Sequence, residues 1–343
     1  MSNLFGNVKK NTVATILVAL FGVIMMSQSA FAAAQYHWRF ANLYGRGTAF
    51  GKIYEDLAKD IEKRTHGAIK VQVLFSGEGV GTQGLFGAAK TGLIEMIAPF
   101  QAMNAGEFPA GVIELGLPGG TNDPAKLQKL FHKDGWGKIL KKAYATQGLV
   151  WLEPYIQPAV YIITKKPIKS VKDFQGLKIR APGAYGKFLR NLGASPVSLA
   201  WSEIYTSLAT GVIDGSIGSN MIDHRDGNHE EVAKYMYPLP EAGAQVLPIL
   251  VNQAAWNKLT PKLQKEVYAA TVDHAKEQLT KSRKWEQEAL NEMIKKGLKW
   301  SPKPSAADKA AWKKAGAGLW EEYSKKGPYC KELIDVLKKT ENQ

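Results

Sequence analysis

Three short predicted strands in the second half of the chain lead into residues that could hold an anion. The strand over 177–180 ends at Arg180, the strand over 196–199 leads into Trp201, and the strand over 212–217 leads towards Asn220. Ligands of open α/β sheets bind outside the carboxyl ends of the strands, so we expect a guanidinium, an indole and an amide at one sheet edge. An arginine can donate two parallel hydrogen bonds to one carboxylate, which the point charge of a lysine cannot. The pattern therefore predicts a carboxylate-binding site.

Arg180 and Trp201 also have more ordinary interpretations. Arg180 could be a surface arginine in a salt bridge, and Trp201 could belong to the core. Pro182 and Gly183 follow Arg180 directly and predict a tight turn that fixes the backbone beside it, which favours a binding role. Further candidates for the site, most of them aromatic residues that could form an apolar wall, are Phe100, Tyr185, Tyr44 and Gln157.

Gly79, Gly81 and Gly84 match the spacing of a dinucleotide-binding fingerprint, after a predicted strand and before a predicted helix. This leaves open an exported oxidoreductase that uses the turn from Gly79 to Gly84. The match is weak, because the strand is the second of its unit and Glu95 comes too early to bind a ribose. We favour a plain glycine-rich turn and expect no cofactor.

The run from Asp223 to Glu230 gathers side chains that could bind a metal ion. His224 and His229 are five residues apart, however, which places them on different faces of a helix. We therefore interpret the run as a solvated loop and expect no metal site. The chain also lacks a Gly-x-Ser-x-Gly motif and a His-Glu-x-x-His motif, so it is not predicted to be an enzyme.

The elements that must position these residues alternate as in an α/β protein. In the first unit, helices over 49–66 and 85–90 separate strands over 38–41, 69–75 and 93–98. In the second unit, helices over 184–192 and 202–210 separate strands over 177–180, 196–199 and 212–217. Two such units predict two lobes, each with a mostly parallel sheet flanked by helices.

Three further segments could connect the two lobes. Residues 148–164 and 244–252 are apolar and interrupted by proline, as expected of hinge strands. Residues 262–296 contain neither Gly nor Pro and predict one bridging helix about 50 Å long. We expect residues 35–157 plus 246–285 to form lobe 1, and residues 158–245 plus 286–343 to form lobe 2.

Residues 1–34 have the composition of a cleaved signal peptide. Lys9 and Lys10 precede the apolar run 13–26, and small residues follow up to Ala34. The apolar run is shorter than the roughly 20 residues that a membrane span needs. We therefore expect a periplasmic protein whose mature chain begins near Gln35.

The composition predicts a globular body that prefers anionic ligands. The chain has 343 residues, of which 45% are hydrophobic and 22% charged, which argues against extensive disorder. Its net charge of +14 falls to +12 without the two leader lysines. The lysines are scattered beside glutamates, so we expect no nucleic-acid partner. The single cysteine, Cys330, cannot form an internal disulfide and is interpreted as structural.

Several motifs resemble those of the periplasmic solute-binding proteins of TRAP (tripartite ATP-independent periplasmic) transporters, the DctP-like family. The most specific are KPIKSVKDFQGLKIR at 166–180, LGASPV at 192–197, WSEIY at 201–205 and GVIDG at 211–215. Weaker matches lie at 65–71 and 251–259. The resemblance covers nearly the whole mature chain.

This resemblance implies a two-lobed protein that closes on a small organic acid, with Arg180 holding the carboxylate, and delivers it to a membrane-embedded permease. Many members have a Glu-Asn or Glu-Trp pair where this chain has SIGSN at 216–220, and a second arginine of sialic-acid-binding members falls near Val160. These departures argue against sialic acid and against a carboxylate-assisted metal site. Two questions are left undecided. The protein could instead be a sensory binding protein that presents its closed form to a receptor, and its oligomeric state is not predicted.

Overall fold

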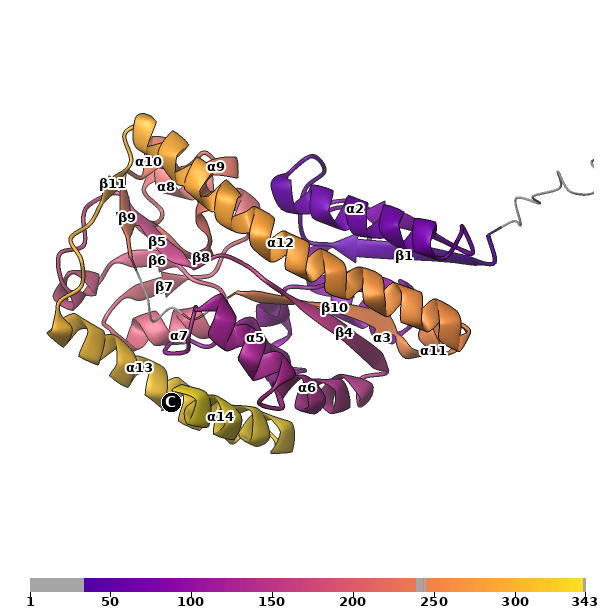
Figure 1. Cartoon of the computed structure of the whole chain (residues 1–343). Coiled ribbons are helices and arrows are strands. Elements are labelled where there is room, and N and C mark those ends of the chain that lie inside the picture. The colour runs from indigo at the N-terminus through magenta and orange to yellow at the C-terminus, as the bar shows by residue number, and fades with distance from the viewer. Residues whose placement is uncertain (1–33, 239–242, 244, 342–343) are drawn as a thin grey trace, which may run out of the picture.

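The computed structural model describes residues 34–238, 243 and 245–341, and these form two β-sheets flanked by helices (Figure 1). The first sheet has the order β2-β1-β3-β10-β4 and the second the order β11-β9-β5-β8-β6-β7. The strands of the first sheet are β1 (Tyr36–Asn42), β2 (Ile69–Leu74), β3 (Met96–Ala98), β4 (Leu149–Ile156) and β10 (Val246–Asn252). Those of the second are β5 (Tyr161–Thr164), β6 (Lys178–Arg180), β7 (Ser195–Val197), β8 (Gly215–Ser219), β9 (Tyr235–Tyr237) and β11 (Lys299–Trp300).

The predicted two-lobed α/β architecture is confirmed, and each sheet combines parallel with antiparallel pairs. Strand β1 runs parallel to β2 and β3, whereas β10 runs antiparallel to β3 and β4. In the second sheet, β6 runs parallel to β7 and β8, whereas β5 runs antiparallel to β8 and β9. The antiparallel strands β10 and β5 lie in the two segments predicted as hinge strands. In the chain, each of these two strands follows a strand of the other sheet. It is therefore not connected to its neighbours by the helical crossover that a pair of consecutive parallel strands requires.

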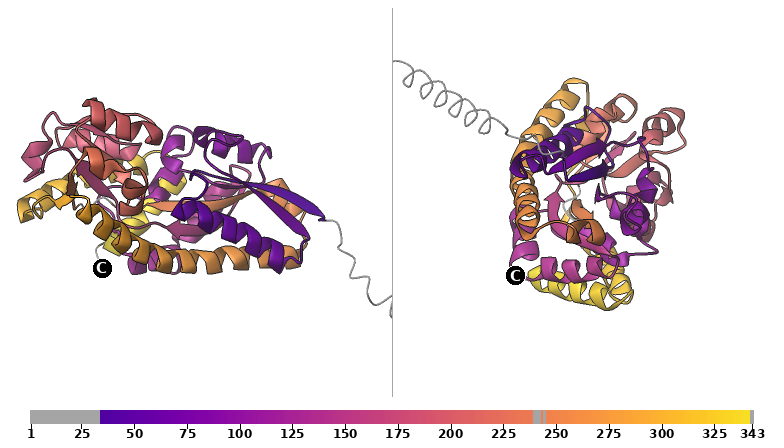
Figure 2. Two further views of the ribbon diagram at one scale, coloured as in Figure 1. Left: turned by 90° about the horizontal axis from the view of Figure 1, so that it is seen from above. Right: turned by 90° about the vertical axis from the view of Figure 1, so that its right-hand side faces the viewer.

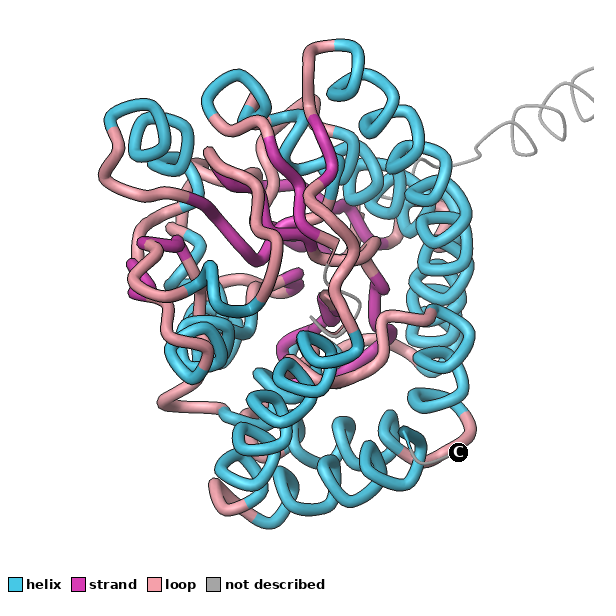
Figure 3. The backbone as a smooth tube through the Cα atoms, turned by 90° about the vertical axis from the view of Figure 1, so that its left-hand side faces the viewer, coloured by secondary structure: helices cyan, strands magenta, loops and turns pink. Residues whose placement is uncertain are grey.

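The helices surround the strands on the outside of the molecule (Figure 3). Those of the first half are α2 (Ala49–Arg64), α3 (Leu85–Lys90), α4 (Pro109–Leu115), α5 (Pro124–His132) and α6 (Trp136–Ala145). Those of the middle are α7 (Ala184–Asn191), α8 (Ile204–Thr210), α9 (Met221–Asp226), α10 (His229–Val232) and α11 (Gln253–Asn257). The last three are α12 (Pro261–Lys295), α13 (Ala306–Ser324) and α14 (Pro328–Glu341), and short 3-10 turns η1 to η4 lie at 82–84, 101–104, 171–174 and 201–203. None of the helices in the described part is both long and apolar enough to cross a membrane.

Helix α12 confirms the predicted bridging helix. Thr260 caps its N-terminus by accepting a hydrogen bond from the Leu263 N–H, and Pro261 occupies its first turn. The helix has 35 residues and packs against α2 and β4 of the first lobe and against α9 of the second. Seen from above, it runs along most of the length of the molecule (Figure 2).

The C-terminal helices connect the lobes in a way that the sequence pattern does not predict. Helix α13 packs against α7, whereas α14 packs against α4, α5 and α6 of the first half. The predicted boundaries place residues 286–343 in lobe 2 as one piece, and α14 nevertheless contacts helices that those boundaries assign to lobe 1. The boundaries themselves stay a prediction. The predicted leader lies outside the described residues except for Ala34.

A buried glutamate, Glu114 in α4, sits in a hydrogen-bonded network of the first lobe. Its carboxyl group bonds the hydroxyl of Tyr144 and accepts a 2.5 Å hydrogen bond from the indole N–H of Trp151. The Gln101 amide donates to the Tyr144 hydroxyl at 2.8 Å. Burial raises the pKa of Glu114 to about 8, although both hydrogen bonds act in the opposite direction. The carboxyl group is therefore protonated over much of the pH range below 8.

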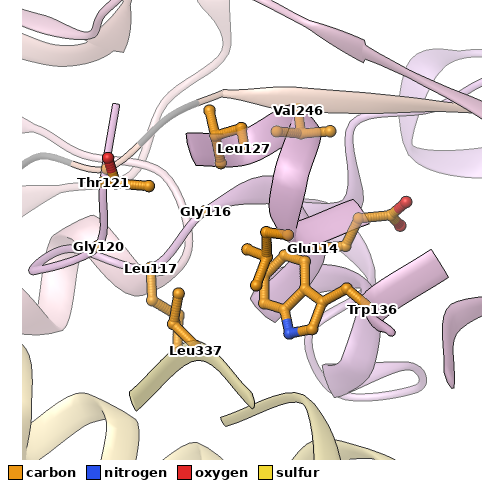
Figure 4. A pocket seen from close by; sticks show the side chains of 11 residues that line it. Glu114, Gly116, Leu117, Gly120, Thr121, Leu127, Trp136, Val246 and Leu337 are labelled. Carbon is orange, nitrogen blue, oxygen red and sulfur yellow. The ribbon is translucent and has the colours of Figure 1, made fainter. Parts of the chain in front are cut away.

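The nearby apolar pocket is not the predicted binding site. It lies between α4, α5 and α14, beside the loop over 116–121, and its lining includes Leu127, Trp136 and Leu337 (Figure 4). None of the candidate ligand-binding residues lines it.

The raised pKa of Glu114 predicts how stability depends on pH. Between pH about 4.5 and 8 the folded state holds a proton that the unfolded chain has released, so the unfolding free energy falls as pH rises. One such group contributes a slope of at most about 1.4 kcal/mol per pH unit. Glu114→Gln should flatten this slope in urea unfolding between pH 5 and 8, whereas the exposed Glu332→Gln should not. Equal slopes in the two variants would contradict the prediction.

Candidate ligand-binding site

Arg180 is the last residue of β6 and is almost completely buried, with 5% of its surface exposed. Its Nε atom donates to the Leu199 carbonyl and its Nη1 atom to the Ile217 carbonyl, both at 3.3 Å. It forms no ion pair with any described residue. Burial lowers its pKa to about 10. The surface salt-bridge interpretation is therefore wrong. Among the residues that the structure describes, Arg180 is a buried cation without a counter-charge, an arrangement that costs free energy unless an anion binds.

Polar groups of β8 lie beside Arg180. Ser216 is the direct neighbour of Arg180 in the parallel pairing of β6 and β8. The hydroxyls of Ser216 and Ser219 are buried and have no hydrogen-bond partner among the described residues. Asn220 caps α9 by accepting a 2.9 Å bond from the Asp223 N–H, and its Nδ2 atom is left unpaired. Buried polar groups are rarely left unsatisfied, so these atoms are available to form hydrogen bonds with a bound ligand.

Gln157 follows β4 at the first crossing between the sheets. Its N–H donates to the Gln245 carbonyl at 2.8 Å, which joins the two crossing segments. Both polar atoms of its side chain are buried and unpaired, as is the Oε1 atom of Gln245. The crossing region therefore offers further hydrogen-bonding groups without partners among the described residues.

The predicted aromatic candidates come from both halves of the molecule. Phe100 follows β3 and is buried, and Tyr44 is buried in a cluster with Phe50 and Tyr54. Tyr185 is buried in α7, and burial raises its pKa. Trp201 has 39% of its surface exposed to solvent, so it is not a core residue.

The two lobes touch next to Arg180. Gly183 has φ +52° and ψ −126°, a conformation that residues with a side chain rarely adopt. A Cβ atom at this position would lie 2.9 Å from the Cβ of Ala102, which follows β3 in the first lobe. Only a glycine therefore allows the turn after Arg180 to approach the first lobe this closely.

Two buried histidines belong to the same region, so the interpretation of residues 223–230 as a solvated loop is wrong. His224 in α9 and His229 in α10 are 0% and 2% exposed, and their Nδ1 atoms lie 3.0 Å apart. The helical conformation is interrupted between α9 and α10 at Gly227 and Asn228, and Asn228 has a φ of +52°. The Gly-Asn pair is the signal that could have revealed this break, because one continuous helix would separate the rings. The ring of Trp201 lies 4.9 Å from that of His229, measured between centroids.

The glycine-rich turn at 79–84 lies at a different edge. It follows β2, the outermost strand of the first sheet, and leads into η1 and α3. Glu95, the acid considered for a ribose, is paired with Arg39 at 2.9 Å. This placement does not favour the oxidoreductase alternative. The described residues also contain no group of three His, Cys, Asp or Glu side chains that could hold a metal ion.

Two α/β lobes that meet beside a buried arginine, which forms no ion pair with any described residue, are the architecture of a binding protein that encloses its ligand between the lobes. The family comparison agrees with this class. The model of the bacterial extracellular solute-binding proteins, family 7 (DctP), matches residues 40–326. The chain belongs to this family, whose members are extracytoplasmic solute receptors of TRAP transporters.

Individual relatives support the same conclusion. The chain is 28% identical over 333 residues to the monocarboxylate 2-oxoacid-binding periplasmic protein of Nostoc sp.. The alignment covers 95% of this chain and 90% of that protein. A crystal structure of DctP7 from Bordetella pertussis, a receptor binding pyroglutamic acid, superposes with a TM-score of 0.80 at 20% identity over 88% of this chain and 99% of that chain. A TRAP solute-binding protein from Bordetella bronchiseptica, with copurified calcium and picolinate, has a TM-score of 0.79 at 25% identity over 90% and 92%.

Proposed function

We propose that this protein captures a small organic acid, a monocarboxylate, by closing its two lobes around it, with Arg180 gripping the carboxylate. The buried guanidinium of Arg180, which has no counter-charge among the described residues, is the observation that carries the proposal. Asn220, Gln157 and the unpaired serine hydroxyls of β8 supply hydrogen bonds to the rest of the ligand. Trp201, Phe100 and Tyr185 supply the apolar wall.

We further propose that the closed, loaded protein delivers the acid to a TRAP permease in the membrane. Closure follows from the site itself, because each lobe supplies only part of the contacts and the bound acid therefore stabilises the closed state. No catalytic role is proposed, since the site needs only to bind and release.

The proposal is tested with four acids bound by neighbouring structures: pyroglutamate, malonate, D-glucuronate and picolinate. An acid present at a hundred times its dissociation constant adds about 2.7 kcal/mol to the free energy of unfolding, so the melting temperature should rise. The radius of gyration in solution scattering should fall as the lobes close. Native mass spectrometry of protein purified without added ligand identifies the natural acid. Tight binding with no change in scattering would contradict the closing cleft.

We also propose that the protein acts in the periplasm after removal of its leader. The small residues that end at Ala34 are the signal for cleavage. N-terminal sequencing of exported protein should therefore find a start within one or two residues of Gln35. An intact Met1 on periplasmic material would contradict this.

A further inference from the structure

We propose that the His224–His229 pair is the proton-accepting part of the acid site, and that one proton enters the pair when a carboxylate binds at Arg180. The inference rests on the proposed function, because it requires an acid at Arg180. It adds that capture of the acid is coupled to uptake of a proton.

The geometry of the pair requires a shared proton. Two ring nitrogens 3.0 Å apart form a hydrogen bond only if one of them carries a hydrogen atom and the other does not. The ring planes are inclined by 66° and the centroids lie 5.3 Å apart. Because both rings are buried, two positive charges at this distance would repel each other strongly. The pair therefore acts as one unit that can accept a single additional proton.

Burial keeps this unit neutral while the acid is absent, and the charge of Arg180 adds to the effect. Burial is the main cause of the lowered pKa values of both rings, and the positive charge of Arg180 lowers them further. The pKa of His229 falls to about 4, and that of His224 lies well below its usual range. The backbone of Tyr161, in β5, acts in the opposite direction on His224. The indole of Trp201 packs against the His229 ring at an angle of 55°.

Most of the other charged groups around the pair have partners of their own. On α9, Asp226 is paired with Arg225 at 2.7 Å. Asp223, next to His224, forms no ion pair with another described residue, and burial of its carboxyl group raises its pKa to about 7, which weakens its negative charge near the pair. On α10, Glu230 forms an ion pair at 2.9 Å with Lys296, which follows α12. Glu231 accepts a 2.9 Å hydrogen bond from the hydroxyl of Tyr205 in α8.

A bound carboxylate reverses the effect of Arg180. Its negative charge offsets the guanidinium, which removes a repulsion and raises the pKa of the histidine pair. The bound state then holds more protons than the empty state, so affinity for the acid increases as pH falls. The gain can approach about tenfold per pH unit for one proton, but only in the range between the pKa of the pair in the loaded protein and the pKa of about 4 that His229 has in the empty one.

Calorimetry with pyroglutamate tests the coupling, because the carboxyl group of this acid is ionised at pH 6 and takes up no proton itself. Titrations in two buffers with different ionisation enthalpies, MES and Bis-Tris at pH 6, give the number of protons taken up per acid bound. We expect a fractional uptake, up to one proton, in the wild type and in the control His37→Asn, whose histidine is exposed on β1. His224→Asn and His229→Asn should each show little or no uptake, and their affinity should vary less with pH.

Two outcomes would overturn the coupling: measurable binding without proton uptake in the wild type, or unchanged uptake in both histidine variants. If none of the four acids binds, the proposed function fails by itself, and the pair is tested in the empty protein. NMR titration of the histidine rings should then give higher pKa values for His224 and His229 in Arg180→Met than in the wild type. Equal values would show that Arg180 does not help to keep the pair neutral.

Discussion

Arg180→Lys is expected to weaken binding of the acid about ten- to a hundredfold while leaving the melting temperature of the empty protein nearly unchanged. Lysine keeps the positive charge but cannot donate two parallel hydrogen bonds to one carboxylate. A charge-assisted hydrogen bond contributes about 1.5–3 kcal/mol, which corresponds to this range of affinities. Arg180→Ala should weaken binding further, because the carboxylate would then be buried without a counter-charge. Calorimetry with the acid identified by mass spectrometry measures both losses.

The control for this prediction is Arg190→Lys, at an exposed position in α7 of the same lobe, which should bind the acid as the wild type does. An amidated analogue of the acid should bind poorly to the wild type and lose little more in the variant, because the interaction is already absent. An Arg180→Lys protein that binds as tightly as the wild type would refute the assignment. A large loss of stability in the empty variant would instead indicate a structural role.

Gly183→Ala is expected to weaken binding by more than tenfold, because the added methyl group prevents the lobes from meeting. The new Cβ would lie 2.9 Å from the Cβ of Ala102, closer than two carbon atoms can pack. The variant also carries backbone strain, since φ is +52° at this position. In solution scattering it should remain more open than the wild type at saturating acid.

Two further variants separate the contact from the strain. Gly176 also has a positive φ, +75°, but has no neighbour within 4 Å of its Cβ position, so Gly176→Ala should lower stability without weakening binding. The double variant Gly183→Ala with Ala102→Gly removes the opposing methyl group and should recover much of the lost affinity. Failure of this rescue would mean that the effect of Gly183→Ala is confined to its own turn.

The fold could be predicted from the sequence wherever a local signal marks an element. Gly211, with φ +78°, ends α8 where expected, and Thr260 and Pro261 begin the long helix. Strand β8 begins three residues later than predicted, at Gly215, because Val212 and Ile213 are apolar and resemble the start of a strand but belong to the connection from α8. The packing of α14 against α4 to α6 depends on contacts between residues roughly two hundred positions apart, which no local pattern reports.

The candidate site could be predicted only in part, for the same reason. Arg180 and Asn220 follow from the rule that ligands bind at the carboxyl ends of strands, and the structure places both beside β8. The histidine pair was missed because spacing along a single helix separates its members, whereas a break at Asn228 brings them into contact. The role of Gly183 depends on Ala102 in the other lobe, so it becomes visible only when the two lobes are placed together.

The position of β10 determines when the first sheet can be completed. This strand lies between β3 and β4, although it follows nearly all strands of the second sheet in the chain. During synthesis, which begins at the N-terminus, the first sheet cannot be completed until residues 246–252 have been made. By that time most strands of the second sheet are available. In the interval β4 has no partner strand and one edge of β3 is open, and exposed strand edges are prone to aggregate. The first sheet is therefore completed only when most of the second sheet is available, so the two lobes depend on each other to finish folding.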